Sequence, residues 1–182
     1  MNATYRLQGR RQGGFILIAS LLILAILTIL SVSMSSSFNL QELIAGNLRE
    51  KTRAYESAQS ALHYAEYWLN QGNNSTGTPC TGLTSTPVVC SNALANPQTT
   101  PWTVGVNYTP PNMNVSSGGG LTAGIENYAA NPRFYIQYLG TNVSGIYYRI
   151  NAVGYGGNSS AIAVIQSTYM FPAGTGKSLG GP

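Results

Sequence analysis

Residues 9–33 read GRRQGGFILIASLLILAILTILSVS, and this stretch decides what kind of fold the chain can have. Arg10-Arg11 and Gly13-Gly14 precede an apolar run of 18 positions, Phe15 to Val32, with three hydroxyl residues in it. The apolar core of a cleaved secretory signal covers about 7–15 residues, so this run is long for one. At about 1.5 Å per residue, residues 15–34 span about 30 Å, the thickness of a membrane's hydrocarbon core. The run can therefore be a membrane helix.

The residues on either side of the run are compatible with a retained membrane helix and with a cleaved export signal. The arginines before it predict that the N-terminus stays in the cytoplasm and that the rest of the chain is exported. Ser31-Val32-Ser33, however, is a small-residue site at which an ordinary secretory signal could be cut. Arg10-Arg11 before an apolar run also matches a twin-arginine signal weakly, although its flanking residues fit poorly.

The apolar pattern continues beyond the run as an amphipathic helix from Asn39 to Leu69. One stripe of this helix is defined by residues that recur every seven positions and by neighbours three and four positions away: Leu48, Tyr55, Leu62, Leu69, Ile44, Ala58 and Ala65. Together, residues 15–70 predict about 56 residues of near-continuous helix. A serine cluster at 31–37 is its weak point, where Asn39 and Glu42 could restart the helix as a capping box. A cleaved signal would not need such a continuation.

The charge distribution argues against nucleic-acid binding. The net charge is +4, but three of the nine basic residues precede Phe15, and the rest of the chain has six basic against five acidic residues. Charged residues make up 8% of the chain, against about 25% in an ordinary globular domain. No basic patch remains that would neutralise a run of phosphates. The composition suits an exported protein that packs against copies or relatives, and equally a weakly charged secreted domain.

A short basic leader ending in Gly-Gly, then Phe, then a long apolar helix resembles the class III signal of type IV pilins and pseudopilins. The resemblance implies that a prepilin peptidase cuts between Gly14 and Phe15. It also implies that the apolar helix is kept as anchor and assembly element, with these positions singled out: Phe15, Ala19, Leu22 and Leu30. The runs QELIAGNLREKTRAYESAQSALHYAE (residues 41–66), PRFYIQYLG (132–140) and YYRINAVGYGGNSSAIAVIQSTY (147–169) resemble PilX-type minor pilins.

One position departs from the pattern of most major pilins, which carry a glutamate as the fifth residue after the cut. That position is Ala19 here, and no acidic residue occurs between Phe15 and Gln41. Some tip-located members of the family omit this glutamate. The departure therefore puts incorporation along the pilus shaft in doubt.

The expected fold class is α+β and type IV pilin-like: a long N-terminal α-helix, half membrane and half amphipathic, packed on a small antiparallel β-sheet. Six segments are expected: leader 1–14, transmembrane and assembly helix 15–34, amphipathic helix 35–70, loop-rich region 71–130, antiparallel sheet 131–173 and tail 174–182. Three strands with alternating or continuous apolar residues form the sheet: Arg133–Leu139, Ile146–Val153 and Ala161–Tyr169. The start of the last strand is apolar throughout, which predicts a strand covered on both sides.

The region 71–130 is rich in Gly, Asn, Thr, Pro and Ser, which predicts long loops. Trp102–Tyr108 is its one plausible strand, and Gly118–Gly120 predicts a turn. Cys80 and Cys90 are the only cysteines, and in an oxidising periplasm they are expected to form a disulfide.

Catalytic, metal and cofactor sites are not expected. His63 is the only histidine and lies on the amphipathic helix, where it is expected to be a surface or packing residue. Four of the five glutamates lie on the same helix, and two cysteines without further ligands do not make a metal site. The glycine-rich stretch 154–157 joins two strands and precedes no helix, so it is not a phosphate-binding loop.

These observations predict a minor pilin and not an enzyme. It would be an inner-membrane single-pass precursor with a periplasmic head, cut by prepilin peptidase, that then enters a type IV pilus and primes assembly or occupies the tip. Pilus-dependent adhesion and motility would follow. The expected partners are other minor pilins, the major pilin, the inner-membrane assembly platform and a pilus-tip adhesin. A type II secretion pseudopilin, a membrane-anchored adhesin or binding domain that never polymerises and, last, an anchored enzyme remain the alternatives.

Overall fold

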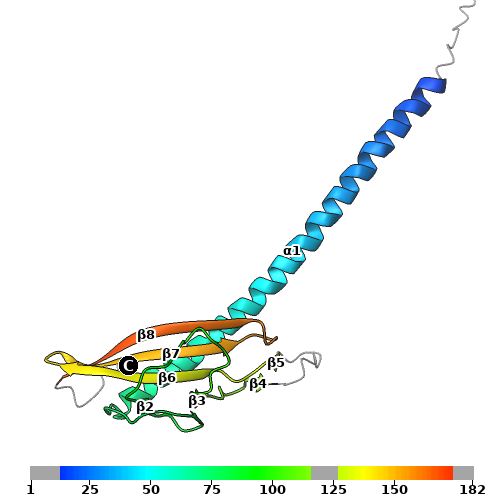
Figure 1. Cartoon of the computed structure of the whole chain (residues 1–182). Helices are drawn as coiled ribbons and strands as arrows, with labels where there is room; N and C mark the ends of the chain where they lie inside the picture. Colours follow the sequence, from blue (N-terminus) through cyan, green and yellow to red (C-terminus); the bar gives the residue numbers. More distant parts are fainter. Residues whose placement is uncertain (1–12, 116–126, 174–182) are drawn as a thin grey trace, which may run out of the picture. The chain divides into compact units, whose positions relative to one another are not determined.

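The computed structural model describes residues 13–115 and 127–173. Within these ranges the chain forms one long helix, α1 (Gly13–Asn70), followed by eight strands. The strands are β1 (Leu83–Thr84), β2 (Val89–Cys90), β3 (Gly105–Asn107), β4 (Asn114–Val115), β5 (Asn127–Tyr128), β6 (Arg133–Asn142), β7 (Gly145–Tyr155) and β8 (Ile162–Pro172). The chain divides into two compact units, Met1–Ala45 and Gly46–Pro182. The first contains the apolar part of α1, and the second contains the rest of α1 and every described strand (Figure 1).

Helix α1 runs without a break through the serine cluster at 31–37 and past Asn39. The capping-box restart at Asn39 is therefore not observed. Between Phe15 and Gln71 the chain contains no proline and a single glycine, Gly46, so nothing in this stretch removes a backbone donor or strongly disfavours the helical conformation.

The predicted antiparallel sheet is confirmed in its three long strands. β6, β7 and β8 are consecutive and antiparallel, and they lie side by side in Figure 1. The short strands add parallel pairs: β2 pairs with the outer edge of β6, and β1 pairs with β3, which is itself antiparallel to β6. The sheet is thus mixed but mainly antiparallel, and β4 and β5 form a separate parallel pair.

The C-terminal part of α1 packs on one face of this sheet, which we call the helix face (Figure 1). Alternate residues of β6 and β7 supply its core, and register pairs such as Phe134–Ala152 and Ile136–Ile150 place them on the same side. The aromatic ring of Tyr64 on α1 stacks on that of Tyr108 at a centroid distance of 4.3 Å. The expected common face is confirmed, because the predicted residues of both strands lie in the core against the helix: Phe134, Ile136, Tyr148, Ile150 and Ala152.

The predicted apolar stripe of the amphipathic helix is wrong in part. Leu62 and Leu69 are buried, but Leu48 and Tyr55 are 66% and 47% exposed. The buried face is built mainly from small residues, of which Ala58 and Ala65 belong to the predicted stripe and Ala54, Ser57 and Ala61 do not. At Ala54 and Ala58 the backbone of Gly154 leaves no room for a larger side chain, and Leu48 and Tyr55 lie outside this contact.

The opposite face of the sheet, which we call the loop face, is covered by residues from the region 71–130. Trp102 is 3% exposed and packs in a second core cluster with Cys90, Tyr135, Val153 and Tyr155. Ile162 and Val164 of β8 are only half-buried at its edge. Ile165 packs on the helix face and Ile162 and Val164 on the loop face, so the start of β8 is covered on both sides, but only in part.

Three predictions fall on residues outside the described ranges. They concern most of the leader 1–14, the turn at Gly118–Gly120 and the tail 174–182.

Candidate assembly helix and its anchorage in the head

The apolar part of α1 exposes its large side chains on every side. Phe15 is 77% exposed, Ile29 71% and Leu22 58%, and none of the large apolar residues from Phe15 to Met34 is buried. By length and composition, α1 is the one helix in the described chain that could cross a membrane. A helix that is apolar all round needs an apolar environment, either lipid or other helices.

The hydroxyl groups in this run are satisfied within the helix. Ser20 Oγ donates to the Leu17 carbonyl at 2.9 Å, and Thr28 Oγ1 donates to the Ala25 carbonyl at 2.8 Å. Ser31 Oγ donates in the same way to the Leu27 carbonyl at 2.8 Å. Such local bonds spare a helix in hydrocarbon the cost of unpaired polar groups.

The sequence-predicted assembly residues lie along one side of α1. Spacings of four, seven and fifteen positions from Phe15 bring Ala19, Leu22 and Leu30 within about a quarter of the helix circumference. Gly14 lies in the first turn, where an added Cβ would meet no described atom within 4 Å. The folded helix therefore places no steric demand for glycine at position 14.

In the second unit, β7 ends in a close contact with α1 that the sequence did not reveal. A Cβ on Gly154 would lie 2.2 Å from the Ala54 carbonyl oxygen and 2.3 Å from the Ala58 nitrogen. A Cβ on Gly156 would lie 2.6 Å from the Glu50 carbonyl oxygen. The glycines at 154–157 therefore let a strand end rest directly on the helix backbone. We call this contact the glycine clamp.

Polar groups extend the glycine clamp. Glu50 Oε2 accepts a hydrogen bond from the Gly157 backbone N–H, and Glu50 Oε1 pairs with Arg53 Nη1 at 3.0 Å. Arg53 Nη2 donates to the Asn127 carbonyl at 2.8 Å, and its guanidinium lies 4.6 Å from the centroid of the Tyr128 ring. Glu50 and Arg53 therefore pair with each other and also bind the backbone of distant loops. A glycine-rich strand end opposite small helix residues was the available signal.

Cys80 and Cys90 form a disulfide in the structure. Asn92 brackets it, since its Oδ1 accepts from the Cys80 N–H at 2.7 Å and its Nδ2 donates to the Cys80 carbonyl at 3.0 Å. Tyr135 of β6 donates its hydroxyl to the Asn92 carbonyl at 2.9 Å. The disulfide loop is therefore tied to the central part of the sheet.

His63 lies on the exposed side of α1, with Nδ1 3.4 Å from Glu66 Oε2. Within residues 13–115 and 127–173, no group of three or more His, Cys, Asp or Glu side chains could hold a metal ion.

Comparison with models of protein families shows which family combines such an apolar helix with such a second unit. The PilX N-terminal model matches residues 13–63, and the model of the type IV pilus assembly protein PilX C-terminal region matches residues 64–171. The chain belongs to the PilX family of type IV pilus assembly proteins. No curated protein and no solved structure matches it.

The PilX assignment covers both units, with its boundary inside α1. It identifies the chain as a PilX-type minor pilin and agrees with the pilin-like α+β arrangement of the fold. The PilX family is a structural component of the pilus and not a known family of enzymes. The apolar part of α1 is accordingly its candidate membrane anchor.

Proposed function

We propose that this minor pilin is cut between Gly14 and Phe15 by prepilin peptidase and then primes a type IV pilus or occupies its tip. Before assembly it is a single-pass inner-membrane protein with its N-terminus in the cytoplasm and its head in the periplasm. Its partners are other minor pilins, the major pilin, the assembly platform and a tip adhesin, and through them it supports adhesion and motility.

One observation carries the proposal: the apolar segment of α1 contains no ionisable side chain from Phe15 to Gln41, and Ala19 occupies the fifth position after the cut. In pilins that carry a glutamate there, its carboxylate is thought to pair with the N-terminal amine of a neighbouring subunit. A carboxylate left unpaired in an apolar core costs about 3 kcal/mol even on the forgiving insertion scale. A subunit with no neighbour above it has no such amine, so alanine suits the end of the fibre.

The position in the fibre is tested by immunogold labelling of sheared, purified pili. The proposal expects the protein in the sheared fraction, in few copies and labelled at one end. Dense labelling along the shaft contradicts a tip position. Absence from sheared fibres, with the protein retained in the membrane, favours an anchored protein that does not polymerise.

Ala19→Glu gives a second test on the same residue. The added carboxylate should not raise the amount of this protein in fibres, and it should lower the number of pili if initiation needs an apolar residue. Ala19→Gln serves as the matched control, because it adds a side chain of the same size at the same position without a charge. An increase in incorporation with Ala19→Glu would place the protein in the shaft.

A further inference from the structure

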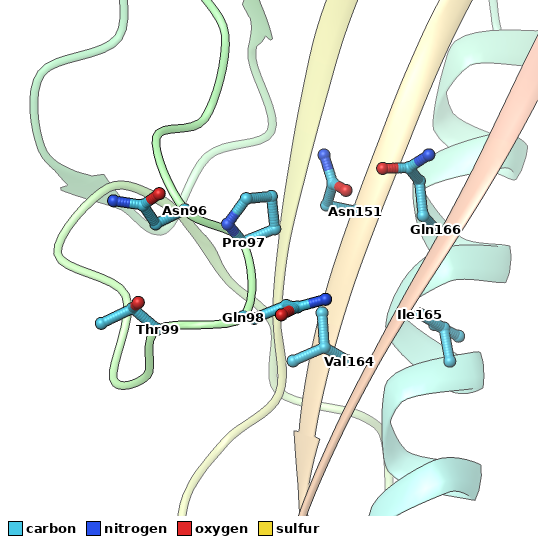
Figure 2. Close-up of a pocket in the computed structure, with 8 residues that line it drawn as sticks. All are labelled: Asn96, Pro97, Gln98, Thr99, Asn151, Val164, Ile165 and Gln166. Atoms are coloured by element: carbon cyan, nitrogen blue, oxygen red, sulfur yellow. The ribbon is translucent and has the colours of Figure 1, made fainter.

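A pocket of about 390 Å³ lies on the loop face of the sheet. Its lining comes from one turn of the loop region and from two neighbouring strands: Asn96, Pro97, Gln98 and Thr99 on the turn, and Asn151, Val164, Ile165 and Gln166 on β7 and β8. Figure 2 shows the turn on one side of the space and the two strands on the other. Its volume falls within the range of about 300–1,000 Å³ of small-molecule sites.

The turn that forms one wall is held in place by the core. The Thr99 N–H donates to the Asn96 carbonyl at 2.9 Å, which closes the turn, and Asn96 has a φ of 48°. The indole N–H of the buried Trp102 donates to the Pro97 carbonyl at 2.8 Å. The hydrogen bond from the buried Trp102 therefore fixes the position of this turn.

The floor contains a buried polar group without a partner. Asn151 is 1% exposed, and its Oδ1 has no hydrogen-bond partner among the described residues. It lies in register between Tyr135 and Gln166, but the Tyr135 hydroxyl is used by Asn92. A buried amide oxygen with no donor costs stability, and a ligand that donates a hydrogen bond to it would recover that cost.

The chemistry of the lining selects the ligand class. No lining residue is charged, and the polar groups are the carboxamides of Asn96, Gln98, Asn151 and Gln166 and the Thr99 hydroxyl. A carboxamide offers donors and an acceptor, which matches hydroxyl groups that can act as either. Pro97 and Val164 add apolar surface for C–H groups. An ionic ligand would find no opposite charge in this lining.

We propose that this pocket binds a neutral saccharide. Asn151 Oδ1 accepts a hydrogen bond from a sugar hydroxyl or acetamido N–H, and Gln98 and Gln166 bind further hydroxyls at the rim. A peptide strand fits less well, because the free edge available for strand addition belongs to β8. Asn151 lies one strand further in, on the sheet face, where an added backbone would not reach it.

The test uses the full chain in a detergent without a sugar headgroup. Glucose, galactose, mannose and N-acetylglucosamine are titrated with saturation-transfer NMR and tryptophan fluorescence as readouts, and N-acetylneuraminic acid is the charged comparison. We expect saturable binding of at least one neutral sugar. If none of the four saturates, or if only the charged sugar binds, the proposal is wrong.

Three variants locate the binding. Asn151→Leu removes the buried acceptor, and Gln98→Ala changes an exposed turn residue that the fold does not need. Each should weaken sugar binding by about tenfold or more, which is well resolved in a titration. Thr168→Ala is the control, because Thr168 is exposed on β8 and does not line the pocket.

The outcomes remain decisive if Asn151→Leu fails to fold, since Gln98→Ala then carries the test alone. Unchanged sugar affinity in Gln98→Ala and in any folded Asn151→Leu protein would overturn the proposal. Displacement of the sugar by an uncharged peptide that binds more tightly at the same residues would also overturn it, because the occupant would then be a protein segment.

Discussion

At Gly154 the backbone of β7 touches the backbone of α1, and no side chain has room between them. The atoms that an added Cβ would meet belong to the main chain at Ala54 and Ala58, which cannot move aside as the end of a side chain can. Gly156 repeats the contact at Glu50. The glycine clamp therefore sets how closely the sheet can approach the helix.

Gly154→Ala should lower the free energy of unfolding of the second unit (Gly46–Pro182) by about 1–3 kcal/mol or more, because overpacking forces the helix and strand apart. Thermal unfolding of the full chain, followed by near-UV circular dichroism, measures the loss. Gly82→Ala is the control, since an added Cβ there meets no described atom within 4 Å. Equal unfolding temperatures for the two variants would show that the clamp is not tight.

Tyr148 provides a prediction about alkaline pH. Burial, with a smaller contribution from the nearby Tyr138, raises the pKa of Tyr148 to about 12. An unfolded tyrosine has a pKa of about 10, so the folded protein binds this proton more tightly. The stabilisation is complete below about pH 10 and is lost as the pH rises from about 10 to about 12.

Tyr148→Phe should therefore make the free energy of unfolding fall less steeply between about pH 10 and 12, as measured by denaturant titrations at several pH values. Some slope remains, because burial also raises the pKa values of Tyr135 and Tyr155. Tyr67→Phe changes a residue that is 60% exposed and serves as control. Identical slopes in wild type and Tyr148→Phe would contradict the prediction.

At the scale of elements, the region after α1 is held in place by a disulfide and by side-chain hydrogen bonds, here called tethers, more than by regular secondary structure. Its strands β1 to β5 have two or three residues each. The disulfide, the Asn92 brackets and the Trp102 indole hold this region against the loop face. These tethers replace the long strand pairs that keep β6, β7 and β8 together.

Removing the disulfide should loosen this region. The Cys80→Ser/Cys90→Ser pair should lower the free energy of unfolding by about 3 kcal/mol, because it reopens a short loop in the unfolded chain. The unfolded but unreduced wild type should show no reactive thiol in a labelling assay. Two labelled thiols would refute the linkage, and an unchanged stability in the double variant would show that the other tethers suffice.

At the scale of the whole molecule, one helix serves two environments. Up to Ala45 its exposed surface is mainly apolar, and from Gly46 onward one side packs small residues against a sheet while another carries charge. Under the proposed function, the apolar part of α1 would first lie in the membrane and then pack in the fibre, and processing at the start of the helix would link these two states.

Mass spectrometry of the mature protein should find an N-terminus at Phe15. Replacing Gly14 with a bulky residue such as Leu should leave the leader attached and prevent assembly. Membrane insertion should persist, because the apolar run is unchanged and the helix itself places no steric demand on position 14. A mature N-terminus at Met34 would instead indicate ordinary secretion.

The sequence by itself predicted the long helix, the three long strands and the pairing of the cysteines. These depend on local properties: apolar length, residue periodicity and two cysteines with no other partner. It also predicted which residues of β6 and β7 face the helix, because alternation along a strand is visible in the chain. The cleavage site and Ala19 rest on the same kind of local pattern and stay predictions.

Only the tertiary structure decided which face of the helix is buried and where the pocket lies. The predicted stripe was right for Ala58 and Leu62, but Leu48 and Tyr55 are exposed, and Gly154 brings the sheet against Ala54, which the stripe did not include. The pocket joins a turn near Pro97 to Asn151, more than fifty positions away. Contacts between distant segments depend on how closely their backbones approach and on which polar atoms remain unpaired. A local sequence pattern predicts neither of these.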